Sequence, residues 1–86
     1  MGSKEEKQKE RLKSIPADYT FTEATALLGR MGFVLKNKGS TSGSRVLFYR
    51  ESDEKKIMLH KPHPGDVMKK GAVRGLVEAL RESGDL

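Results

Sequence analysis

SRVLFYRESDEKKIMLH, residues 44–60, contains two runs in which apolar and polar side chains alternate, separated by a short acidic turn. Successive side chains of a strand point to opposite faces of a sheet, so this alternation predicts two strands with one buried face each. Val46 and Phe48 share one side of the first strand, and Ile57 and Leu59 share one side of the second. The short link predicts that the two strands are antiparallel.

A third strand is expected directly before this pair. Phe33–Lys38 alternates in the same way, and Phe33 and Leu35 lie on the side expected to face the core. Ser44–Arg50 and Lys55–His60 are the other two strands. Because strands joined by short connections pair as neighbours, the three form an antiparallel meander.

Amphipathic helices are predicted on both sides of this meander. Before it, Thr20 and Glu23 have the spacing of a capping box, and Gly32 is expected to end the helix in a left-handed conformation. After it, a second helix is expected from about Gly71 to Ser83, with Gly84 as its terminator. The apolar stripes expected in the core are Ala24, Leu27, Leu28 and Met31 in the first helix and Val73, Leu76, Val77 and Leu80 in the second.

The predicted fold class is α+β, in the order helix, three strands, helix. Two helices are expected to cover one face of a three-stranded antiparallel sheet, and the 35% hydrophobic content of the 86 residues allows one domain with a thin core. Residues 20–86 are assigned to this domain. Residues 1–19 are expected to form a charged arm or short solvated helix, because Lys4–Lys13 mixes charges and has Leu12 as its one aliphatic residue.

Composition excludes several classes of protein. The chain has no cysteine, which excludes disulfides and thiolate metal sites and suits a reducing cytosol. No apolar run approaches the roughly 20 residues that span a membrane. The charged residues 1–6 lack the apolar segment of a signal peptide. We therefore expect a cytoplasmic protein without membrane attachment.

The charge distribution favours a polyanionic partner. The formal net charge is +5, and no acidic residue occurs between Arg30 and Arg50. A local run of one sign favours nucleic acid over no partner, whereas the alternative is charge that only maintains solubility. The side chains expected on the open face of the sheet are Lys36, Lys38, Arg45, Leu47, Tyr49, Met58 and His60. The alternative for this face is ordinary solvation, which is common in antiparallel sheets.

Two segments have the residue types that bind phosphate. The first is a loop of small hydrogen-bonding residues before the second strand, comprising Gly39, Ser40, Thr41, Ser42, Gly43, Ser44 and Arg45. Flexible backbone N–H groups, hydroxyls and an arginine favour anionic oxygens, although a plain hairpin linker has a similar composition. The second segment has Lys69, Lys70 and Arg74 around the start of the last helix, where the positive helix end also attracts phosphate. A solvated helix face is the alternative.

His60 and His63 are the candidates for acid–base chemistry. Either imidazole, close to Lys61, is able to act as general base or acid in phosphodiester cleavage. The residue pattern alone also fits two surface histidines beside a turn, and that reading is favoured without further information. A metal site is not expected, because strand residues three apart point to opposite faces and Asp66 is the one carboxylate nearby.

Several segments together resemble the HicA family, the toxin component of bacterial toxin–antitoxin pairs. Leu27–Phe33 resembles the family's leucine-rich helix that leads into Gly-Phe, and Lys38–Ser40 resembles its Lys-Gly-Ser step. Pro62–Gly65 and Lys69–Arg74 resemble its loop and the entry to its final helix. The resemblance covers about Thr20 to Leu80.

This resemblance implies a double-stranded-RNA-binding-domain-like fold, mRNA interferase activity that needs no metal or other cofactor, and a HicB-type antitoxin as partner. The family usually has a histidine after Gly-Ser, and here that position is Thr41, so the catalytic residue does not carry over. His63 matches a histidine position in the family's loop, and His60 is close by. Three functions remain open: a toxin-like ribonuclease using His60 or His63, a non-catalytic RNA-binding module, and a subunit whose sheet docks an acidic protein.

Overall fold

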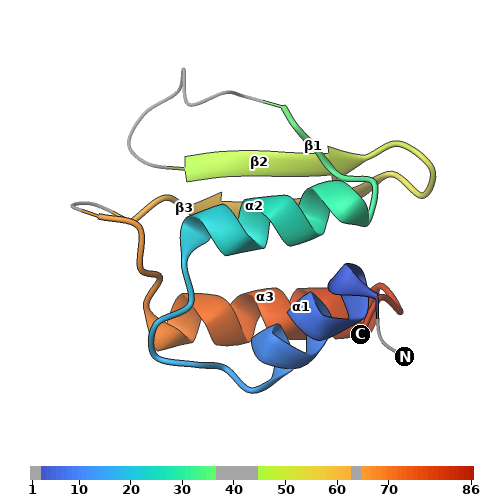
Figure 1. Ribbon diagram of the computed structural model, residues 1–86. Coiled ribbons are helices and arrows are strands. Elements are labelled where there is room, and N and C mark those ends of the chain that lie inside the picture. Colours follow the sequence, from blue (N-terminus) through green and yellow to red (C-terminus); the bar gives the residue numbers. More distant parts are fainter. Residues whose placement is uncertain (1–2, 37–44, 63–64) are drawn as a thin grey trace.

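The computed structural model describes residues 3–36, 45–62 and 65–86. Its elements are α1 (Lys4–Lys13), α2 (Phe21–Arg30), β1 (Val34–Leu35), β2 (Arg45–Arg50), β3 (Lys55–His60) and α3 (Lys70–Glu82) (Figure 1). The predicted α+β class and the order helix, three strands, helix are confirmed, with α1 as an additional helix in front. This arrangement is consistent with a double-stranded-RNA-binding-domain-like fold.

The three strands form one antiparallel sheet in the order β1-β2-β3. Val46 pairs with Leu59 and Phe48 with Ile57, so four apolar side chains point to the same face. All four are buried. The predicted alternation of β2 and β3 and their antiparallel order are therefore confirmed.

Among the described residues 33–36, the first strand comprises Val34–Leu35, and one further bond extends the ladder, from the Lys36 N–H to the Leu47 carbonyl at 2.8 Å. The rest of the predicted strand, residues 37 and 38, lies outside the described residues. Leu35 pairs with Phe48, yet it is 40% exposed, so its assignment to the core is wrong. The physical reason is its place on a two-residue edge strand, where an inward-facing side chain still meets solvent. Phe33, at the turn from α2, is buried as predicted.

Both predicted helix stops are present. Gly32 and Gly84 have φ of 96° and 85°, the left-handed conformation expected of a glycine that ends a helix. The N–H of Phe33 donates to the Leu28 carbonyl at 2.9 Å, and the N–H of Asp85 donates to the Leu80 carbonyl at 2.8 Å. These bonds pair carbonyls that would otherwise lack partners at the helix ends.

The predicted capping box at the start of α2 is also present. The Glu23 N–H donates to the Thr20 hydroxyl at 3.1 Å, and the Thr20 N–H donates to the Glu23 carboxylate at 3.0 Å. The carboxylate thus holds the residue that precedes the helix, and α2 begins at a defined point.

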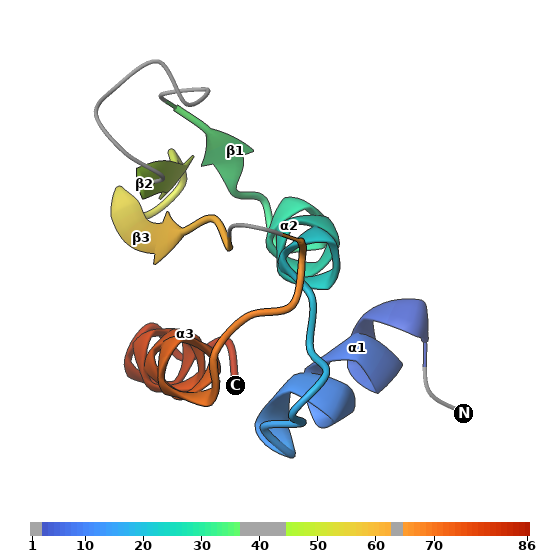
Figure 2. The same cartoon turned by 90° about the vertical axis from the view of Figure 1, so that its left-hand side faces the viewer.

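The N-terminal segment is a helix that packs on the domain. α1 lies against α2 and α3, on their side away from the sheet (Figure 2). Leu12 is fully buried and Tyr19 is 1% exposed. The Arg11 guanidinium donates to Glu23 at 3.1 Å and to the Asp18 carboxylate at 3.2 Å. Only part of α1 is therefore solvated, and the domain boundary at residue 19 stays a prediction.

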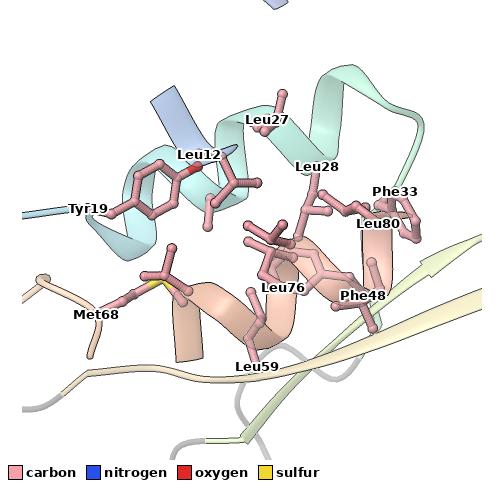
Figure 3. Close-up of a cluster of buried hydrophobic side chains, with 14 of the residues drawn as sticks. Leu12, Tyr19, Leu27, Leu28, Phe33, Phe48, Leu59, Met68, Leu76 and Leu80 are labelled. Carbon is pink, nitrogen blue, oxygen red and sulfur yellow. The ribbon is translucent and has the colours of Figure 1, made fainter. Parts of the chain in front are cut away.

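The core is built from every layer of the molecule. Figure 3 shows Leu12 and Tyr19 beside α2, with Leu76 and Leu80 of α3 between them and the sheet residues Phe48 and Leu59. Met68, which precedes α3, is 2% exposed and was not predicted in the core. Its position outside any periodic pattern explains why the sequence did not reveal it.

We predict that Leu12→Ala lowers the free energy of unfolding by about 2–5 kcal/mol, because it removes a fully buried side chain and leaves a cavity. Urea unfolding followed by circular dichroism measures this. Lys13→Ala, on the exposed side of the same helix, is expected to stay within about 0.5 kcal/mol of the wild type. If Leu12→Ala lowered the free energy of unfolding as little as Lys13→Ala, α1 would not be packed on the domain.

The capping carboxylate generates a prediction about pH. The hydrogen bond from Arg11 lowers the pKa of Glu23 from 4.5 to about 2. The folded state thus favours the ionised carboxylate, and its stabilisation is present above pH 4.5 and lost as the pH falls toward 2. Glu23→Gln, which keeps an acceptor for the Thr20 N–H, should show a shallower fall of unfolding free energy over this pH range. Identical pH profiles for variant and wild type would refute this assignment.

Candidate nucleic-acid interface

One end of the molecule gathers the starts of α2, α3 and β2 and the end of β3 (Figure 1). The segment before α3 is held beside the start of α2 by backbone bonds. The Phe21 N–H donates to the Asp66 carbonyl at 2.7 Å, and the Met68 N–H donates to the Tyr19 carbonyl at 2.8 Å. Both helices therefore begin at this end, which we call the basic end and define by Arg45, His60, Lys61, Lys69, Lys70 and Arg74.

The strand register places Arg45 directly opposite His60. Both are exposed on the face of the sheet that the helices leave open. Directly opposed side chains in an antiparallel pair have Cβ atoms about 4.5–5.5 Å apart. The structure thus brings together a permanent cation and an imidazole, two of the predicted site residues. Lys61 follows His60 and is also exposed.

The start of α3 adds further positive charge. Lys69 is the N-cap residue, Lys70 is the first helical residue and Arg74 lies one turn later, and all three are exposed. The Lys69 side chain makes no capping hydrogen bond, and the first turn contains no acidic residue. The first-turn N–H groups and the helix dipole consequently favour an anion at this point.

The start of α2 differs, because acidic groups already occupy it. The Asp66 carboxylate accepts the Thr22 N–H at 3.2 Å, and Glu23 belongs to the capping box. Asp66, the one carboxylate near His60 and His63 in the sequence, anchors the segment before α3 to the start of α2. Its contact partner is 44 positions away in the sequence, so no local pattern indicated this role.

The centre of the open face interleaves apolar and basic groups, as predicted. Tyr49 pairs with Lys56 and Leu47 pairs with Met58. The Lys36 ammonium lies 5.2 Å from the centroid of the Tyr49 ring. Met58 is 50% exposed. Lys36, Arg45 and His60 therefore share one face of the sheet.

The opposite end of β2 is electrically neutralised. The Arg50 guanidinium donates to Asp53 and Asp85 at 2.7–2.9 Å and to the Met31 carbonyl at 3.0 Å. Hydrogen bonds from Arg50 hold the pKa of both carboxyl groups below their ordinary value. Arg50 belongs to the acid-free run of the sequence, yet in the fold it is a structural cation. At this end of β2, therefore, the arginine is already paired with carboxylates of the same domain.

Six predicted site residues cannot be placed, because Lys38, Gly39, Ser40, Thr41, Ser42 and His63 lie outside the described residues. Within the described part of the chain, His60 has no hydrogen-bond partner, so no carboxylate orients its ring there. Among the same residues, no group of three or more histidine, aspartate or glutamate side chains is arranged to hold a metal ion.

The fold and the distribution of its cations define a small basic α+β domain with a double-stranded-RNA-binding-domain-like order of elements. Residues 21–84 match the sequence model of the family described as the HicA toxin of bacterial toxin–antitoxin systems. The match covers most of the chain, and the protein belongs to the HicA toxin family. α1 precedes the matched residues. No curated protein and no solved structure matches the chain.

In the part of the chain that the structure describes, no helix has the length and apolar character that crossing a membrane requires.

Proposed function

We propose that this protein is the toxin of a toxin–antitoxin pair and that it binds mRNA at the basic end and cleaves it without a metal ion. The observation that carries the proposal is the pairing of Arg45 with His60 on the open face of the sheet. A cleavage site for RNA needs a group that moves a proton and a cation that stabilises the phosphorane charge. These two side chains supply both functions.

In the proposed reaction, the His60 imidazole takes the proton from a ribose 2′-OH. The 2′-oxygen then attacks the adjacent phosphorus, and the bond from phosphorus to the 5′-oxygen breaks. The products are a 2′,3′-cyclic phosphate and a 5′-hydroxyl, whose proton comes from a second acid. We assign that acid to the imidazolium of His63, three positions along the chain, while Arg45 faces the phosphate oxygens.

The remaining cations of the basic end are proposed to hold the RNA backbone. Lys69, Lys70 and Arg74 surround a helix start without an acidic cap, which favours phosphate. Lys61 extends this charge from the end of β3. The other proposed phosphate contacts are Lys36, Lys38, Gly39, Ser40, Thr41 and Ser42. Such contacts supply most of the affinity for RNA and weaken as salt rises.

The proposed partner protein is a HicB-type antitoxin, because the family consists of toxins that act in such pairs. We also propose a cytoplasmic location, because mRNA and such an antitoxin are found there. Inhibition requires that the antitoxin covers the basic end or prevents RNA from reaching it.

A second function, RNA binding without cleavage, is favoured by two observations. His60 has no hydrogen-bond partner among the described residues, and Thr41 occupies the position where the family usually has a histidine. A threonine hydroxyl does not take a proton from a 2′-OH without a base of its own. In this case the basic end holds RNA through phosphate contacts alone.

Cleavage of labelled mRNA in EDTA separates the two functions. We expect the wild type to cut the RNA. We expect the cleavage rate of His60→Ala to be lower by at least about 100-fold, since general acid–base catalysis contributes about 10²–10⁴-fold. His63→Ala tests the proposed acid in the same assay. Lys13→Ala, an exposed cation of α1 paired with Glu10, is the matched control and should cut at the wild-type rate.

Loss of cleavage with retained RNA binding in His60→Ala supports the ribonuclease. Salt-sensitive binding of intact RNA by the wild type would instead establish the non-catalytic function. Wild-type cleavage by both histidine variants would refute the assignment of these residues.

A further inference from the structure

β3 forms one edge of the sheet, and its outer side has no partner strand among the described residues. The Lys36 N–H bonds the Leu47 carbonyl, so the backbone of Leu47 faces β1. Backbone groups of successive strand residues point to alternate sides, so Val46 and Phe48 face β3 and bond Leu59 and Ile57.

The same alternation turns the N–H and C=O groups of Lys56, Met58 and His60 outward. These three residues present a row of backbone donors and acceptors of the kind that pairs with an added strand.

A groove runs along this edge, between β3 and α3. Its volume is about 280 Å³, and its lining includes Met58 of β3 and Ala72, Gly75 and Ala79 of α3. Met58 contributes to this lining from β3, although its half-exposed side chain lies on the open face of the sheet. An added strand points alternate side chains to the two faces of the sheet, so every second side chain would enter this groove.

The fold itself does not require glycine in this groove. Gly75 lies in the interior of α3, where glycine is less favourable than alanine. A Cβ atom at this position would have no neighbour within 4 Å. The space beside Gly75 is therefore free for a side chain from outside the domain.

The charges of β3 indicate which kind of strand can pair with its outer edge. The strand contains Lys55, Lys56 and His60 and no acidic residue. Two copies of this chain paired antiparallel through β3 and centred on Met58 would place the lysine at 56 opposite the histidine at 60. A second copy is therefore disfavoured, whereas a strand with acidic side chains is complementary.

We propose that the outer edge of β3 binds an extended acidic segment of a partner protein, which adds to the sheet as a fourth strand. Its acidic side chains face Lys56 and His60 on the open face, and its small apolar side chains enter the groove beside Gly75. The segment would then lie next to His60 and obstruct the basic end. Equating this partner with the HicB-type antitoxin would rest on the proposed function. The docking itself requires no ribonuclease activity.

The test uses the whole chain and a labelled seven-residue peptide in which valine and glutamate alternate, followed by fluorescence anisotropy. We expect saturable binding whose affinity falls about tenfold when the peptide amides facing β3 are N-methylated. N-methylation removes the N–H donors, and each buried β3 carbonyl left without a hydrogen bond lowers the binding free energy. A peptide with lysine in place of glutamate is expected to bind at least about tenfold more weakly, and Lys56→Glu should reverse this preference.

Two glycine variants make a matched pair. Gly75→Leu fills the groove and should weaken binding of the acidic peptide about tenfold, whereas Gly29→Leu makes the same change on α2, where a Cβ also has open space, and should not alter it. Thermal unfolding of both variants shows that they are folded. If Gly75→Leu is unfolded at 25 °C, the N-methylated peptide and the Lys56→Glu variant become the deciding measurements.

Three results would overturn the proposal. The first is no detectable binding at a peptide concentration of about 1 mM. A dissociation constant of that size corresponds to a binding free energy of about 4 kcal/mol. The second is equal binding of the parent and N-methylated peptides. The third is that the peptide does not bind, whereas Gly75→Leu changes the affinity of the protein for a short single-stranded RNA. This result would assign the groove to nucleic acid. Failure of RNA cleavage leaves all peptide results valid, so the two proposals fail separately.

Discussion

The packing of one sheet face against the helices determines where every other feature lies. Val46, Phe48, Ile57 and Leu59 are buried under this layer, so their neighbours along each strand must point outward. A slip of one residue would exchange the two faces, bury charges and expose the apolar set. The cost of such a slip keeps Arg45 and His60 opposite one another on the open face. The site is thus a consequence of core burial.

The direction of the helices creates the asymmetry of charge. α2 and α3 run the same way, so their positive ends lie at the end of the molecule where β2 begins and β3 ends (Figure 1). Acidic groups neutralise the positive end of the dipole at the start of α2. The start of α3 has two lysines and no acidic residue in its first turn. At the far end, Arg50 is matched by Asp53 and Asp85. The lysines at the start of α3 thus have no acidic residue in the first helical turn, whereas the arginine at the far end is paired.

Local patterns predicted the parts of the fold that local physics determines. Alternation gave the correct bounds of β3, and the capping box and terminal glycines located α2 and α3 closely. Leu35 was misplaced because alternation does not reveal how far the helical layer extends over an edge strand. The docking of α1 through Leu12, and the anchoring of Asp66 at Thr22, are contacts between distant segments that no sequence window contains. For the site, alternation placed Arg45 and His60 on one face, whereas the predicted roles of both histidines stay predictions.

Arg45, His60 and the start of α3 are proposed to act as one RNA-binding surface. Backbone amide NMR spectra of His60→Ala, recorded during titration with a short mRNA fragment, test it most directly, since this variant is expected to bind RNA and leave it intact. We expect shift changes at Arg45, Lys61, Lys69 and Lys70 that saturate together and diminish with added salt. Changes confined to α1 or to the acidic turn between β2 and β3 would contradict the account.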